Sequence, residues 1–217
     1  MLPLIHKLFL HCLWQYELDL DEEIPPHLKE KWGQVIKDML GFTKTIPRFL
    51  MEKDVNVVLV SFTDASSEAI PACIYLCSDG HSNLLMAKSK LPSIKSKATI
   101  PKLELDAVTI ALRITNAVVS QVQSTLSIRQ VFILTDSEIT LKWIKSRPLK
   151  EAGVMVFNRL MEIERIIDHL HSSGREVFFC HIPTTLDPAD CTTVIGSLSK
   201  AGPVHQKCSI NSWFRST

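Results

Sequence analysis

The chain has 217 residues, of which 46% are hydrophobic and 22% are charged, and its formal net charge at pH 7 is +1. This is an ordinary globular balance that can bury a sizeable core. The small net charge excludes a protein that is basic throughout, so a nucleic-acid partner would have to be held by a local patch. The six cysteines form no CxxC pair, which disfavours a zinc site and favours free thiols in a reducing compartment.

Residues 1–50 predict a small helical segment. Apolar residues recur at helical spacing over about 4–16, and a second helix, about 26–40, begins after Pro25-Pro26. The apolar stretch at the start is interrupted by charged and polar residues and is followed by no small-residue cleavage site, unlike a signal peptide. No apolar run approaches the roughly 18 residues of a membrane span. We therefore expect an intracellular protein, cytoplasmic or nuclear, that has no membrane partner and is not secreted.

Residues 51–200 predict a different organisation, with three strands in succession and then alternating helices and strands. Successive strands favour antiparallel hairpins, and the later alternation favours parallel strands joined by crossover helices. We expect an α/β domain with a five-stranded mixed sheet flanked by helices, followed by a tail at 201–217. The strands are expected at about 56–64, 71–78, 84–89, 130–136 and 176–182, and the helices at about 101–121, 137–146, 154–171 and 188–199.

Two of the predicted strands end on a Thr-Asp pair. Asp64 closes the run in SFTDAS, and Asp136 closes the run in FILTDSE. In open α/β sheets, ligands bind beyond the carboxyl ends of the strands. Taken singly, either aspartate is equally well explained as a turn residue or a helix N-cap. The repeated pattern indicates a shared site.

Glu104 lies in the predicted helix 101–121, on the face shared with Val108, Ala111 and Thr115. A carboxylate within an apolar stripe costs several kcal/mol unless it is paired or binds a cation. The alternative is an acid of the first helical turn, favoured by the helix dipole.

Asp190 is the fourth candidate acid. With Asp187 as N-cap and Pro188 at the first helical position, Asp190 falls in the first turn of the last predicted helix. That position is a sufficient structural reason for an acid, so its functional weight depends on the other three acids.

Four carboxylates without matching arginines would repel one another if the fold brought them together. Divalent cations remove this repulsion, and hard oxygen ligands select Mg²⁺ or Mn²⁺ over Zn²⁺. Two such ions about 4 Å apart support phosphodiester cleavage, one by activating water and the other by stabilising the leaving oxygen. The acids therefore predict a site for two Mg²⁺ or Mn²⁺ ions.

The chain resembles the ribonuclease H region of BEL/Pao-type retrotransposon polyproteins, commonly catalogued as Pao retrotransposon peptidases. The resemblance covers nearly the whole chain and implies a ribonuclease H-like fold that cuts the RNA strand of RNA–DNA hybrids. It also implies that the start of the chain joins this domain to a reverse transcriptase region, a further expected partner. The matching segments are SFTDAS, LLMAKSKLPSIKSKATIPKLEL, FILTDSEITLKWIKS, FNRLMEIERI and HIPTTLDPAD.

The resemblance assigns the catalytic, metal-binding acids residue by residue. The Glu comes between the first two aspartates, as in ribonuclease H, whereas integrases of related fold place it last. The segment CTTVIGSLSK, directly after the last acid, departs from the family's usual Leu-Ala-Ser-Arg-Gly. The assigned acids are Asp64, Glu104, Asp136 and Asp190.

A basic segment, AKSKLPSIKSKATIPK, precedes Glu104 and is the expected contact with nucleic acid. Lysines contact phosphates without reading bases, which suits sequence-independent cleavage. The alternative is a solvated basic loop. The lysines concerned are Lys88, Lys90, Lys95, Lys97 and Lys102.

Two other functions remain open from the sequence. One is a catalytically silent relic of a retroelement that retains nucleic-acid binding. The other, less favoured, is an aspartic peptidase, for which the sequence offers only Asp79-Gly80 preceded by Ser78 in a predicted hairpin turn.

Overall fold

A computed structural model of the chain describes residues 2–19, 21–41, 43, 57–78, 81–94, 98–148 and 152–190. Several predicted features lie outside these residues: the tail 201–217, the helix 188–199 beyond residue 190, Lys95, Lys97 and Asp79-Gly80. The elements are α1 (Leu2–Gln15), α2 (Pro26–Met39), β1 (Val57–Thr63), β2 (Ile70–Ser78), β3 (His81–Lys90), α3 (Ile100–Val122), β4 (Ile128–Thr135), α4 (Glu138–Ser146), α5 (Val154–Ser172), β5 (Glu176–His181) and a 3₁₀ turn, Thr184–Leu186.

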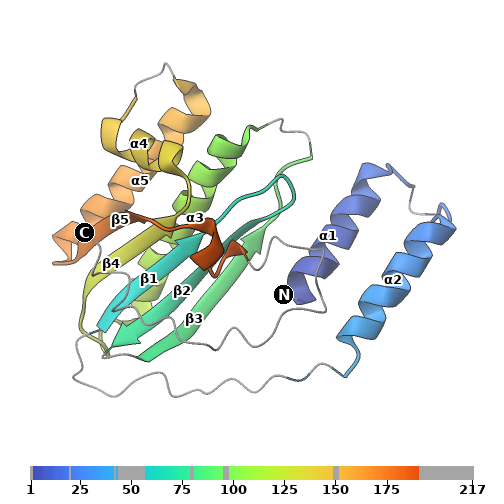
Figure 1. The fold of residues 1–217 in the computed structure, drawn as a ribbon, viewed down its shortest axis with the longest axis horizontal. Coiled ribbons are helices and arrows are strands. Elements are labelled where there is room, and N and C mark those ends of the chain that lie inside the picture. Colours follow the sequence, from blue (N-terminus) through green and yellow to red (C-terminus); the bar gives the residue numbers. More distant parts are fainter. Residues whose placement is uncertain are drawn as a thin grey trace.

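The five strands form one mixed sheet in the order β3-β2-β1-β4-β5 (Figure 1). β1, β2 and β3 are joined by antiparallel pairings, whereas β4 lies parallel to both β1 and β5. This confirms the predicted sheet, with hairpins first and parallel strands later. The third strand starts at His81 instead of residue 84, because its pairing with β2 continues to Ser78, beyond the apolar pattern.

The parallel pairing of β1 with β4 fixes where the two strands end. Thr63 pairs with Thr135 in the last register position. The next residues along the chain are Asp64 and Asp136, which therefore leave the sheet side by side, as the two Thr-Asp strand ends predicted.

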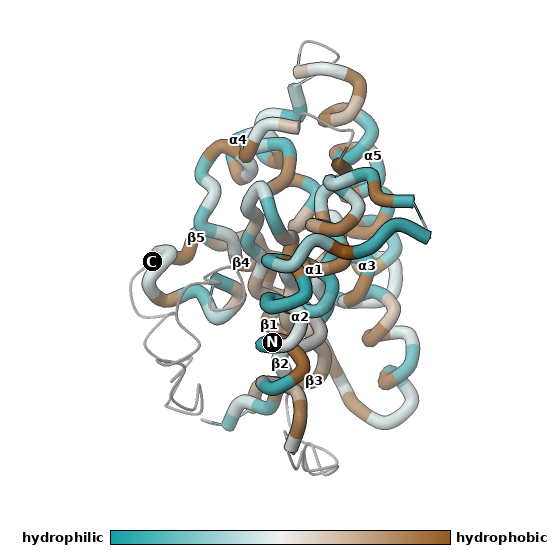
Figure 2. Tube along the Cα trace, turned by 90° about the vertical axis from the view of Figure 1, so that its right-hand side faces the viewer, coloured by the Kyte–Doolittle hydropathy of each residue, from teal (hydrophilic) through white to brown (hydrophobic). Residues whose placement is uncertain are grey.

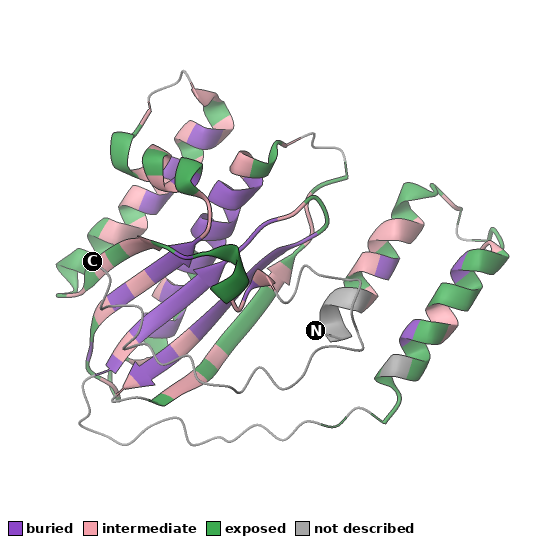
Figure 3. Ribbon diagram, in the orientation of Figure 1, coloured by how far each residue is buried: buried purple, intermediate pink, exposed green. Residues whose placement is uncertain are grey.

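α3 is the central helix on one face of the sheet, where its apolar residues form the main core with β1, β2, β4 and α5. Every residue from Leu103 to Leu112 is buried, which makes α3 one of the most buried elements (Figure 3). By length and composition α3 is apolar enough to cross a membrane, but 67% of its most apolar window is buried inside the protein. The hydrophobicity of α3 is thus that of a core helix, and Figure 2 shows its hydrophobic residues beside the strands.

Asp106 is a second buried acid of α3, and two cations from other elements surround it. Its Oδ2 accepts a hydrogen bond from Lys90 Nζ on β3 at 2.7 Å, and its Oδ1 lies 2.8 Å from Arg159 Nε on α5. Arg159 also contacts Glu162, which pairs with Arg113 of α3. Asp106 therefore ties α3 to β3 and α5.

The opposite face of the sheet carries a smaller apolar cluster, to which Val60, Phe62 and Leu134 contribute. The segment after β5 covers part of this face, because Ile182 and Ala189 are fully or nearly fully buried in the same cluster. The segment 182–190 thus passes close to the ends of β1 and β4 (Figure 1).

The two N-terminal helices confirm the predicted helices at 4–16 and 26–40 to within two residues. They pack on each other through Phe9 and Trp32, whose ring centroids lie 5.0 Å apart. Lys7 Nζ donates a hydrogen bond to the carbonyl of Ser89 on β3, 3.0 Å away.

Deleting residues 1–50 is expected to leave a folded sheet domain, because the main core draws its buried residues from residue 57 onward. We expect a modest fall in melting temperature, and the cleavage activity that the sequence predicts should be weakened but retained. The measurement is thermal unfolding by circular dichroism for the full chain and the deletion variant. A deletion variant that stays folded and loses all cleavage would contradict this prediction.

Candidate metal centre

Asp64 is buried directly after β1. Its Oδ1 accepts a hydrogen bond from the N–H of Ala65 at 2.7 Å. The turn that leads to β2 is closed by Ser66, whose N–H donates to the carbonyl of Ala69 and whose Oγ accepts from the Ala69 N–H. The hydrogen bonds that close this turn are made by Ser66, so the turn does not require an acid at position 64.

Asp136 follows β4 and is not the N-cap of α4. That role belongs to Ser137, whose Oγ accepts the N–H of Thr140 at 3.3 Å. The Oδ2 of Asp136 instead accepts a hydrogen bond from Thr184 Oγ1 at 2.6 Å, which joins it to the 3₁₀ turn after β5. The alternative of a helix cap is thereby excluded for Asp136.

Glu104 lies on the buried face of α3 with Val108 and Ala111, as the helical spacing predicted. It is only 6% exposed and lies after the first turn of the helix, so the favourable helix dipole of that turn does not explain it. Its Oε2 is buried and has no hydrogen-bond partner. A buried carboxylate oxygen without a donor is costly, and a bound cation would offset that cost.

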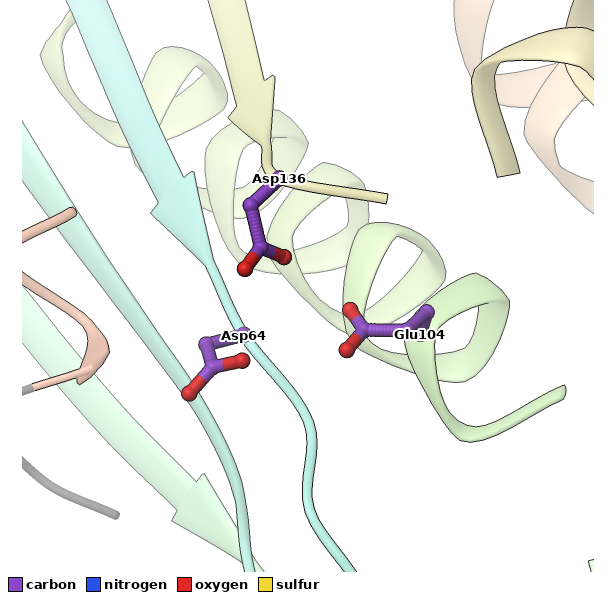
Figure 4. A group of neighbouring side chains, drawn as sticks. All are labelled: Asp64, Glu104 and Asp136. Atoms are coloured by element: carbon purple, nitrogen blue, oxygen red, sulfur yellow. The ribbon is translucent and has the colours of Figure 1, made fainter. Parts of the chain in front are cut away.

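The fold brings these three acids together. Asp64, Glu104 and Asp136 each offer one carboxylate oxygen within 4.8 Å of the other two. Figure 4 shows the three carboxylates pointing toward one common space, two from strand ends and one from α3. An all-oxygen set of this kind suits a hard divalent cation such as Mg²⁺ or Mn²⁺.

The electrostatics of Glu104 reflect this crowding. Burial is the largest cause that raises its pKa, from 4.5 to about 8, and the negative charges of Asp64 and Asp136 raise it further. The N–H of Ala65 acts in the opposite direction. Without a cation, Glu104 therefore keeps its proton at neutral pH, and a bound cation would take the place of that proton.

Asp190 does not belong to the group of three. It is half-buried, and its N–H donates to the carbonyl of Asp187 at 3.2 Å. Its predicted role as a metal-binding acid stays a prediction.

Asp187 lies closer to the acids than the sequence indicated. It is 4% exposed, and burial, followed by the charges of Asp64, Asp136 and Asp190, raises its pKa from 3.8 to about 8. The sequence predicted Asp187 only as an N-cap, and its Oδ1 does accept the N–H of Ala189 at 2.7 Å. In the sequence, the only sign that one turn would carry both acids was that Asp187 and Asp190 are three residues apart.

The predicted nucleic-acid contacts fall into different environments. Lys88 is exposed on β3, Lys102 is half-buried, and Lys90 is held by Asp106. Among the described lysines of this segment, Lys88 is the most accessible for a phosphate. The role of all five lysines stays a prediction.

Comparison with solved structures finds ribonucleases H and viral reverse transcriptases. One is RNase H1 from the halophilic archaeon Halobacterium salinarum NRC-1, with 14% identity over 59% of this chain and 86% of that chain and a TM-score of 0.38. Another is LC11-RNase H1 in complex with an RNA/DNA hybrid, with 14% identity, 63% and 93% coverage and a TM-score of 0.45. The prototype foamy virus protease-reverse transcriptase has 12% identity, 86% and 29% coverage and a TM-score of 0.42.

No curated protein sequence matches the chain. The family model described as Pao retrotransposon-like RNaseH-like domain matches residues 2–137. This match covers more than half of the 217 residues and includes Asp64, Glu104 and Asp136.

Proposed function

Because this chain belongs to the family of Pao retrotransposon-like RNaseH-like domains, we propose that it hydrolyses the RNA strand of RNA–DNA hybrids with two divalent ions, Mg²⁺ or Mn²⁺. The observation that carries the proposal is the convergence of Asp64, Glu104 and Asp136 within 4.8 Å. The unpartnered, buried Oε2 of Glu104 supports a cation at that point. When bound, the ions supply an activated water and neutralise charge on the leaving oxygen.

The surroundings of the three acids hold them in place for such ions. The N–H of Ala65 orients the carboxylate of Asp64, and Thr184 Oγ1 orients that of Asp136. Glu104 is fixed by its position on a helix that is buried on all sides at that level. Positioning of this kind lowers the reorganisation required when an ion and a scissile phosphate bind.

The substrate would be held through its backbone. Lys88 and Lys102 precede or begin α3, and they would contact phosphates without reading bases. Because the chain as a whole carries a net charge of only +1, binding depends on this local patch and should weaken as salt rises. A reverse transcriptase region that supplies the hybrid is the proposed protein partner.

The test is a cleavage assay of the full chain on an end-labelled RNA–DNA hybrid, with Mg²⁺ or Mn²⁺ and with EDTA. We expect metal-dependent cleavage of the RNA strand at many positions, and no cleavage of a DNA duplex of the same sequence. A folded protein that cuts no hybrid with either metal would refute the enzyme and leave a retroelement relic. Cleavage that persists in EDTA would refute the metal mechanism.

A further inference from the structure

We propose that Asp187 is a metal-binding carboxylate of this site and lies nearer to the bound ion than Asp190 does. The inference rests on the proposed function, because it assigns a further residue to the same metal site. Asp187 is 4% exposed, and its Oδ2 is buried without a hydrogen-bond partner, like the Oε2 of Glu104. Two buried, unpartnered carboxylate oxygens thus lie beside Asp64 and Asp136, whose charges affect both groups.

The chain reaches this position through hydrogen bonds that start at the end of β4. The N–H of Ile182 donates to the carbonyl of Thr135 at 3.0 Å, which extends the pairing one residue beyond β5. Thr184 Oγ1 then donates to Asp136, and the N–H of Asp187 donates back to the carbonyl of Thr184 at 3.1 Å. Asp187 is therefore held next to Asp136 by the same turn that binds the Asp136 carboxylate.

A structural role in the turn does not explain why residue 187 is a carboxylic acid. The turn uses only Oδ1 of Asp187, which accepts the N–H of Ala189. An asparagine would accept the same hydrogen bond and caps helices equally well. A cation is the partner that would make Asp the better residue.

Asp190 is less suited to the same position. It is half-buried, as Asp136 is, whereas Asp187 is buried like Glu104. The charge of Asp187 acts on Glu104, and Asp190 is absent from the causes that shift the pKa of Glu104. Asp187 is therefore the more buried acid of this turn, and it lies just outside the group of three whose oxygens are within 4.8 Å of one another.

The test measures Mn²⁺ binding to the metal-free full chain by isothermal titration calorimetry at pH 8. It compares the parent with Asp187→Asn, Asp187→Ser and Asp190→Asn. Asn and Ser both preserve the capping hydrogen bond, so neither should unfold the turn. We expect Asp187→Asn and Asp187→Ser to weaken Mn²⁺ binding roughly tenfold or more, because changing even a group that only supports a metal ligand costs 10- to 100-fold in affinity. Asp190→Asn should weaken it less.

The outcomes separate this proposal from the metal site itself. Binding by Asp187→Asn within twofold of the parent, while the parent binds Mn²⁺ well, would overturn the role of Asp187 and leave the three-acid site intact. A larger loss in Asp190→Asn than in both Asp187 variants would also overturn it. A parent protein that binds no Mn²⁺ and shows no thermal shift with Mn²⁺ would overturn both the proposed function and this inference.

Discussion

Replacing Asp64 with Asn is expected to abolish hybrid cleavage while leaving the metal-free protein as stable as the parent, or more stable. The amide keeps an oxygen that can accept the Ala65 N–H, so the local geometry is preserved. It also removes one of the charges that disfavour ionisation of Glu104 and Asp187. Activity should fall by at least about 100-fold, because even residues that only support a metal ligand cost 10- to 100-fold when changed.

Asp106→Asn is the matched control for this variant. Asp106 is also buried, but two cations form ion pairs with it, Lys90 at 2.7 Å and Arg159 at 2.8 Å. Its neutralisation leaves those cations facing an amide, so the free energy of unfolding should fall by about 1–3 kcal/mol. Metal-dependent cleavage should survive at temperatures where this variant is folded.

The measurement for both variants is the melting temperature with EDTA and with Mg²⁺, together with the cleavage rate. The parent should gain stability with Mg²⁺ by mass action, and Asp64→Asn should lose most of that gain. If Asp64→Asn destabilised the metal-free protein as much as Asp106→Asn does, Asp64 would be a structural residue and the metal site would be refuted.

Raising the pH from about 5 to above 8 should destabilise the metal-free protein by several kcal/mol, with about 8 kcal/mol as the upper limit for the two groups together. The folded-state pKa values of Glu104 and Asp187 are both raised to about 8, from ordinary values of 4.5 and 3.8. Below the ordinary pKa values the folded and unfolded chains both hold these protons, so the two groups do not lower the free energy of unfolding there. Above them the unfolded chain releases protons that the folded chain keeps, so stability falls by up to about 1.4 kcal/mol per group and pH unit until pH passes 8.

Urea unfolding in EDTA at pH 5.5, 7 and 8.5 measures this effect. The double variant Glu104→Gln, Asp187→Asn is the control, and its stability should depend much less on pH. Mg²⁺ should stabilise the parent more at pH 8.5 than at pH 5.5, since ions and protons compete for the same oxygens. An unfolding free energy that rises in the parent between pH 5.5 and 8.5 in EDTA would contradict the prediction.

The sheet could be predicted from the sequence because each strand has a local signal. Apolar runs such as 130–136 mark the strands, and their order along the chain separates hairpins from crossovers. The sequence did not show how far the backbone pairing of β2 with β3 extends. The prediction therefore placed the start of β3 three residues too late. Nor did it predict Asp106 as a buried acid, because its partners Lys90 and Arg159 come from two distant elements.

The candidate site was predictable where periodicity and strand ends place side chains. The buried face of Glu104 follows from helical spacing, and the neighbourhood of Asp64 and Asp136 follows from parallel strands that end on the same motif. Asp187 was missed because its position depends on Thr184 and on the path of the chain after β5, which no local pattern reports. In the sequence, the position of Asp187 indicates only a cap, because one of its oxygens accepts the N–H of Ala189. The role that we propose for its other oxygen leaves no pattern in the sequence.

The register that joins Thr63 to Thr135 also has a consequence for how the protein folds. β1, β2 and β3 can form as local hairpins, but β4 must find β1 across a loop of more than 60 residues, which is entropically slow. During refolding, metal affinity should therefore appear only after hairpin structure, when the first and second halves of the domain meet. A rapid mixing experiment that follows Mn²⁺ uptake would time that late encounter directly.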